Sequence, residues 1–89
     1  MPSMQPQSRP TILRLAVPSP LRRLFDYLPP ADVALESVAA WQPGIRLQVP
    51  FGRRKVIAVL LEVTHHTDLA PEQLKQAIKA LDERPVFSP

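Results

Sequence analysis

Apolar and polar residues alternate along two segments of the chain, residues 12–17 and 45–49. Branched apolar side chains occupy every second position: Leu13, Leu15 and Val17 in the first segment, and Ile45, Leu47 and Val49 in the second. This period of two is typical of a β-strand that buries one face. We therefore predict a strand in each segment. A third short strand is predicted at residues 24–28, because the prolines that follow cannot continue a ladder.

A longer apolar run covers residues 56–63. Its apolar side chains fall on both faces of an extended chain, which is typical of a strand in the middle of a sheet. Residues 46–49 and 56–63 are close enough in sequence to pair as an antiparallel hairpin. The pattern therefore predicts that residues 56–63 form the central and most buried strand, with Arg53, Arg54 and Lys55 at the tip of the hairpin.

The remaining segments carry weaker patterns. Residues 32–41 are rich in alanine but show no apolar stripe, so we expect a loop with at most a helical turn. The proline at position 71 predicts a helical turn over residues 71–73. Residues 74–81 are ambiguous between helix and strand, although their apolar side chains would share one helical face.

Composition sharpens the fold class. Twelve prolines against two glycines in 89 residues impose fixed corners and favour short strands over long helices. We predict a mainly β domain of about five or six short strands, in small, barrel-like, twisted antiparallel sheets with one short helix or helical turn. Residues 1–11 are expected to be a disordered arm and residues 12–89 the folded domain. Because no apolar segment could act as a secretory signal or cross a membrane, we expect a cytoplasmic protein.

The sequence offers little for catalysis or for a metal. Cysteine is absent, which excludes thiolate metal sites and a cysteine nucleophile. His65 and His66 are adjacent and would project apart in an extended chain. No glycine-rich phosphate loop is present. We therefore expect no catalytic residue, no metal and no cofactor. A net charge of +3 indicates a mild preference for polyanions.

Asp26 is unusual because it stands between Phe25 and Tyr27 in an apolar strand. A buried carboxylate needs an ion pair or hydrogen bonds to offset the loss of hydration. A salt bridge to an arginine, or a cap on the next turn, would explain it structurally, and composition alone favours that interpretation. The alternative is an acceptor in a small pocket, flanked by rings that can stack on a base or a sugar.

The predicted hairpin tip is a second candidate site. Gly52 would let the backbone approach a ligand closely, and Arg53 and Arg54 could meet phosphate. A solvated basic tip that serves only solubility is the simpler explanation, and the motif alone is weak.

Three motifs in order resemble one family. They are LAVPSPL followed by FDYL (residues 15–28), GIRLQVPFGRR (residues 44–54), and LK, LD and PVF within residues 74–87. In this order and spacing they resemble the N-terminal domain of PriA replication-restart helicases, over residues 13–87. Members of that family often carry proline after the position of Lys75, so the resemblance implies a strand over residues 75–81 instead of a helix.

The resemblance implies a non-enzymatic DNA-binding module. In that family the domain binds the 3′ end of the nascent leading strand at stalled forks, and an ATP-dependent helicase core follows in the same polypeptide. The partners implied are single-stranded or forked DNA, the rest of the helicase in cis, and primosome proteins through the full-length protein. Carried onto this chain, the pocket for the strand end falls on Phe25, Asp26, Tyr27, Gly52 and Lys75.

Weaker contacts to the DNA backbone are expected from Arg53, Arg54 and Lys55. A terminal hydroxyl is a donor that a carboxylate can accept, whereas a 3′ phosphate would be repelled. The competing interpretation is a small β-barrel adaptor for a protein partner. Under it, Tyr27, Trp41 and Phe51 would form an exposed patch that dominates binding.

Overall fold

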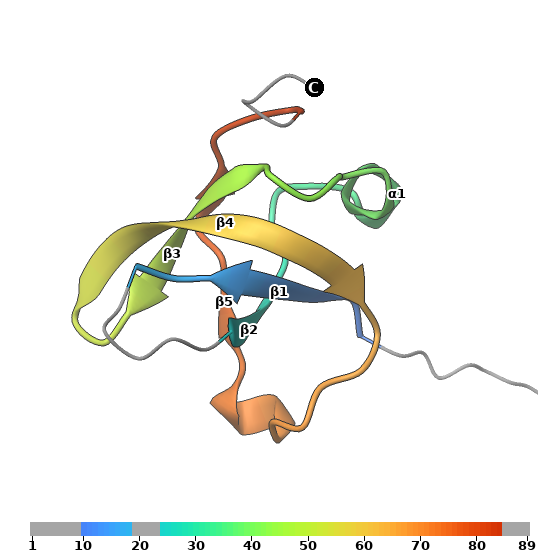
Figure 1. Ribbon diagram of the computed structural model, residues 1–89. Coiled ribbons are helices and arrows are strands. Elements are labelled where there is room, and N and C mark those ends of the chain that lie inside the picture. Colours follow the sequence, from blue (N-terminus) through green and yellow to red (C-terminus); the bar gives the residue numbers. More distant parts are fainter. Residues whose placement is uncertain (1–9, 19–23, 85–89) are drawn as a thin grey trace, which may run out of the picture.

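The computed structural model describes residues 10–18 and 24–84, which form one curled sheet with two short helical elements. The strands in chain order are β1 (Ile12–Ala16), β2 (Leu24–Leu28), β3 (Arg46–Phe51), β4 (Arg54–Thr64), β5 (Lys75–Gln76) and β6 (Lys79–Ala80). The helical elements are α1 (Leu35–Ala39) and a 3-10 turn, η1 (Pro71–Gln73). The sheet curls into a half-barrel, which confirms the predicted mainly β, barrel-like class with one short helix (Figure 1).

Consecutive residues supply both edges of the sheet. Its strand order is β5-β2-β1-β4-β3-β6, so the segment of residues 75–80 pairs with β2 at one edge and with β3 at the other. Between the two pairings, the amide of Ala77 donates to the carbonyl of Leu28 and the amide of Ile78 donates to the carbonyl of Gln48, each at 2.8 Å. The curl brings the two edges close enough for one short segment to span them. The backbone groups of β2 and β3 that face this segment therefore have hydrogen-bond partners and are not left open as sheet edges.

This arrangement confirms strand pairing within the segment expected to be extended, residues 75–81, but not one continuous strand, and the chain bends at Leu81. The ladder is divided into β5 and β6, because the segment changes partner from β2 to β3 at residues 77–78. The β2–β5 pairing is parallel, an exception to the expected antiparallel arrangement. The helical turn predicted at residues 71–73 is confirmed as η1.

The predicted hairpin is confirmed, but its second strand is not the most buried one. β3 and β4 pair antiparallel from Arg46 opposite Val59 to Phe51 opposite Arg54. Although β4 is interior to the sheet, its outward-facing side chains Ile57 and Leu61 are each 42% exposed. The reason is that the sheet curls around a single core, and no second layer covers its outer face in the part of the chain described here.

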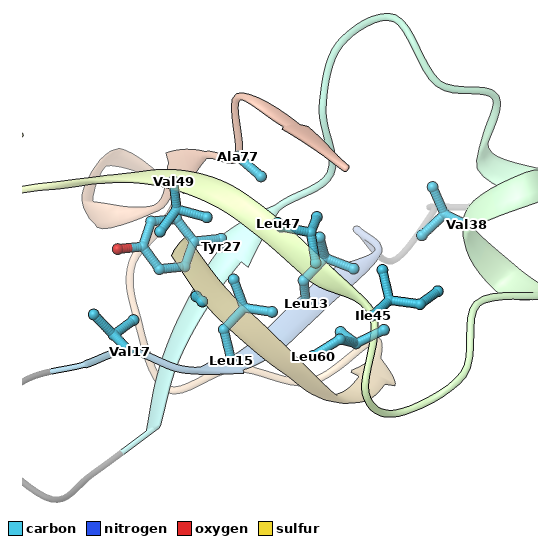
Figure 2. Packing of buried hydrophobic residues seen from close by; sticks show 11 residues of the cluster. Leu13, Leu15, Val17, Tyr27, Val38, Ile45, Leu47, Val49, Leu60 and Ala77 are labelled. Atoms are coloured by element: carbon cyan, nitrogen blue, oxygen red, sulfur yellow. The ribbon is translucent and has the colours of Figure 1, made fainter. Parts of the chain in front are cut away.

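The core lies inside the curl. Alternate residues of the strands point into it, together with Val38 from α1 and Ala77 from the closing segment (Figure 2). Its buried members are Leu13, Leu15, Val17, Tyr27, Val38, Ile45, Leu47, Val49, Ala58, Leu60 and Ala77. The half-buried faces predicted from the period of two at residues 12–17 and 45–49 are therefore confirmed.

Two further expectations concern the ends and the long connection. The loop expected at residues 32–41 contains the single turn of helix α1, which Val38 anchors to the core. The arm predicted at residues 1–11 lies almost entirely outside the described residues. Neither helical element in the described ranges is long and apolar enough to span a bilayer.

Candidate functional site

A cavity of about 440 Å³ lies between β2, the β3–β4 turn and the segment that leads into β5. Its volume is within the range of about 300–1,000 Å³ that is typical of small-ligand clefts. All five residues expected to bind a strand end line it. The full lining is Leu24, Phe25, Asp26, Tyr27, Pro50, Phe51, Gly52, Asp68, Leu69, Gln73 and Lys75.

The sheet topology explains how three distant segments meet there. β5 pairs with β2 only at Tyr27 and Leu28, which places Lys75 opposite Tyr27. Residues 24–26 therefore have no strand beside them on this edge within the described chain, and the cavity opens along it. Gly52 reaches the cavity at the β3–β4 turn, where its φ of 63° favours glycine. Among the described residues, nothing lies within 4 Å of a Cβ atom built at this position, so the backbone faces open space on that side.

Aromatic side chains join the ends of β2 and β3 at the cavity. The rings of Phe25 and Phe51 meet edge to face with their centroids 5.1 Å apart. Tyr27 is only 4% exposed, and its hydroxyl donates to the carbonyl of Pro50 at 2.7 Å. Burial raises the pKa of Tyr27 above its ordinary value of 10.0, so the phenol remains a protonated donor further into alkaline solution than a free tyrosine does. The hydroxyl of Tyr27 is thus engaged within the domain.

Asp26 forms the ion pair that a structural role requires and also lines the cavity that a binding role requires. Its Oδ1 accepts a hydrogen bond from Nε of Arg14 at 3.0 Å, which is the salt bridge that the structural interpretation required. Its Oδ2 accepts from the hydroxyl of Thr67 at 2.6 Å. Asp26 also lines the cavity, and 13% of its side chain is exposed. Since an ionised carboxylate offers roughly four lone-pair sites, each oxygen can accept a further donor.

The basic side chains divide into two groups. Arg14 is bound to Asp26 and Glu62, and these contacts raise the pKa of its guanidinium; Arg46 is bound to Asp82. The hairpin-tip cations, by contrast, are exposed and form no ion pair with any described residue; they are Arg53, Arg54 and Lys55. They follow Gly52 directly without lining the cavity. Lys75, also exposed, lies on the cavity itself.

Several lining residues were not identified from the sequence. Asp68, Leu69 and Gln73 belong to a stretch that reads as a polar loop followed by a helical turn, and no local pattern marks them as a wall. Thr67 does not line this cavity, but its hydroxyl donates to the carboxylate of Asp26, a residue that does. The parallel pairing of β5 with β2 brings the preceding residues 67–73 beside β2, so the local sequence held no signal for them.

The patch required by the adaptor hypothesis does not form. Tyr27 is buried, and Trp41 and Phe51 are partly buried against the core.

The two adjacent histidines have different neighbours. Nδ1 of His65 lies 3.2 Å from the carbonyl of Pro10, and Nε2 of His66 lies 3.7 Å from a carboxylate oxygen of Asp68. Within residues 10–18 and 24–84, no three potential metal-binding side chains gather.

A family model and a curated relative both relate this chain to the same protein family. Residues 14–89 match the model of a family described as the 3'DNA-binding domain (3'BD) of PriA. The chain is also 40% identical over 78 residues to the replication restart protein PriA of Haemophilus influenzae, an alignment that covers 88% of this chain. It spans about a tenth of the length of that relative. The matched unit is a binding module and not the catalytic part of a helicase. The chain belongs to the PriA 3'DNA-binding domain family.

Proposed function

We propose that this domain recognises the 3′-hydroxyl end of a DNA strand, with little dependence on sequence, by accepting the terminal nucleotide in the cavity beside β2. The observation that carries the proposal is that Phe25, Asp26, Tyr27, Gly52 and Lys75 come from three separate segments and line one cavity. Family membership supports DNA as the ligand.

The carboxylate of Asp26 provides the discrimination between strand ends. It accepts hydrogen bonds but donates none while ionised, so a free 3′ hydroxyl can bind to it as a donor. A 3′ phosphate would bring negative charge against the carboxylate and leave both groups poorly solvated. The ion pair with Arg14 leaves this role available, because it uses one lone pair of one oxygen.

The apolar part of the cavity suits the base and sugar of the terminal nucleotide. Phe25 and Phe51 present ring surfaces there, and every base has a face that can stack on an aromatic ring. Gly52 adds backbone, and no atom of the described chain lies within 4 Å of where its Cβ would be. Stacking and backbone contacts tolerate any base, which is the property that recognition of arbitrary strand ends requires.

The exposed cations supply the attraction for phosphate. Lys75 lies at the cavity and can meet a phosphate or the terminal base, while the hairpin-tip cations Arg53, Arg54 and Lys55 flank Gly52. A strand leaving the cavity past the turn would place its phosphates near them. Since few phosphates are contacted, affinity should be modest and should fall with salt.

In this view the domain directs a replication-restart helicase to arrested forks by detecting an unextended strand end. The helicase core and any primosome partner belong to the longer protein that the family implies. The relative that supports this context is a replication restart protein, and this chain corresponds to about a tenth of it.

The test compares fluorescent oligonucleotides of the same sequence that end in a 3′ hydroxyl or a 3′ phosphate. We expect wild-type protein to bind the hydroxyl form more tightly and Asp26→Ala to abolish this preference. Glu62→Ala is the matched control, because Glu62 also pairs with Arg14, at 3.1 Å, but does not line the cavity. It should retain the preference.

Two results would count against the proposal. Equal affinity of the wild-type domain for both ends would remove the proposed recognition altogether. Unfolding of Asp26→Ala, detected by circular dichroism, would show that the carboxylate is structural; Arg14 keeps Glu62 and the carbonyl of His66 as partners in that variant, so we expect the fold to survive.

A further inference from the structure

Residues 65–70, between β4 and η1, form part of the cavity wall and belong to no helix or strand. The shape of this wall therefore depends on the contacts that hold these residues to the sheet. Asp68 and Leu69 line the cavity from this stretch. Side chains of β1 and β2 hold it to this edge of the sheet: Nη2 of Arg14 donates to the carbonyl of His66 at 3.0 Å, and Oδ2 of Asp26 accepts from the hydroxyl of Thr67 at 2.6 Å.

The hydroxyl of Thr67 is engaged twice. Besides donating its only proton to Asp26, it accepts a hydrogen bond from the backbone amide of Leu69 at 3.2 Å. One oxygen atom thus connects the carboxylate proposed to bind the strand end with the backbone of the wall beside it. Asp26 and Thr67 are 41 residues apart in sequence, so this contact exists only in the folded domain.

We propose that Thr67 is a positioning residue for strand-end recognition, which fixes the rotation of the Asp26 carboxylate and holds the Leu69 wall against it. This inference rests on the function proposed above and deepens it. Arg14 anchors Oδ1 while Thr67 anchors Oδ2, so the plane of the carboxylate is defined by one contact to each of its oxygen atoms. The remaining lone pairs then point in fixed directions before any ligand arrives.

The physical benefit is preorganisation. A carboxylate held by a single partner can rotate, and binding must then order it together with the loop that forms the wall. Loss of the Thr67 hydroxyl should weaken binding of a 3′-hydroxyl strand by about five- to tenfold, the cost of ordering one side chain and part of a loop. Binding of a 3′-phosphate strand, which does not use the carboxylate, should change by less than about twofold.

The decisive variants are Thr67→Val and Thr67→Ser. Valine keeps the branched shape but has no hydroxyl, whereas serine keeps the hydroxyl without the methyl group. The ratio of affinities for hydroxyl and phosphate ends should fall in Thr67→Val and stay within about twofold of wild type in Thr67→Ser. A purely structural role would lower stability and both affinities together, and would leave the ratio unchanged.

Thr67→Ala, made in parallel, removes the same hydroxyl without placing a methyl group beside the carboxylate. The ratio of affinities should fall in this variant as well, so it replaces Thr67→Val if the valine variant does not fold. If wild type discriminates between the ends and a folded Thr67→Val or Thr67→Ala discriminates equally well, the positioning role is wrong while the proposed function stands. If wild type does not discriminate, the proposed function itself fails.

Discussion

Removal of the hydroxyl oxygen of Tyr27 tests whether this group stabilises the fold or contacts the DNA strand. Tyr27 is one of the residues expected to bind the strand end, yet its hydroxyl donates to the carbonyl of Pro50 at 2.7 Å and its side chain is almost fully buried. The variant Tyr27→Phe keeps the ring in the cavity wall and deletes only this hydrogen bond.

The expected loss of stability follows from the burial of the bond. A typical intramolecular hydrogen bond contributes about 0.5–1.5 kcal/mol net, and a buried acceptor left without its donor costs about 1–3 kcal/mol. Because the carbonyl of Pro50 is only partly buried, we expect Tyr27→Phe to destabilise the domain by about 1–2 kcal/mol. For a domain of this size each kcal/mol lowers Tm by roughly 4–8 °C.

The assay pairs thermal unfolding with oligonucleotide binding. Tm should fall by roughly 5–15 °C in Tyr27→Phe, while affinity for a 3′-hydroxyl strand below the transition stays within about threefold of wild type, because the ring remains. An unchanged Tm would show that the bond to Pro50 contributes nothing in solution. A tenfold or larger loss of affinity with little change in Tm would show that the hydroxyl contacts the strand, which would refute its assignment as a link between β2 and β3.

The pH dependence of stability gives a second readout on the same variant. Burial raises the folded-state pKa of Tyr27 above its ordinary value of 10.0, so the folded protein holds this proton more tightly than the unfolded chain does. The resulting stability is fully present below pH 10 and is lost as the pH rises through the folded pKa. Wild-type protein should therefore lose Tm above pH 10 more steeply than Tyr27→Phe, and parallel curves would contradict the assignment.

Two further predictions concern the turn and the C-terminal contact. Gly52→Ala should cost about 1 kcal/mol because of its positive φ, and Gly52→Asn should cost less, since asparagine tolerates that conformation; equal losses by urea denaturation would argue against backbone strain as the cause. Arg46 donates to Asp82 and lowers the pKa of that carboxyl below its ordinary value of 3.8, which stabilises the fold above pH 3.8 and is lost as the pH falls through the folded pKa. The difference in Tm between wild type and Asp82→Asn should accordingly narrow in acid, and a constant difference from pH 7 to about pH 2 would contradict it.

The sequence by itself determined the local conformation of most of the chain. The period of two at residues 12–17 and 45–49 identified strands and their buried faces, and the basic hairpin tip followed from the spacing of two apolar runs. Proline at position 71 indicated the turn that became η1. These features depend on backbone preferences and on which side of a strand is apolar, and neighbouring residues specify both.

Residues 74–81 show the limit of such patterns. Their apolar spacing suits a helix, and the resemblance of motifs was needed to predict an extended segment. The exposure of Ile57 and Leu61 on β4 was likewise not predicted, because an apolar run cannot reveal which of its faces the rest of the fold will cover.

The sequence identified residues of the candidate site but not the contacts that hold them in place. Sequence motifs indicated the five residues expected to bind the strand end, Asp26 among them, and the structure places all five on one cavity. They could not reveal that Asp26 is held by both Arg14 and Thr67, since Arg14 lies opposite it through the register of β1 and β2, and Thr67, 41 positions away, meets it only in the folded domain. Local sequence sets the conformation of a strand, but contacts between distant segments depend on the curvature and register of the whole sheet, which only the tertiary structure decides.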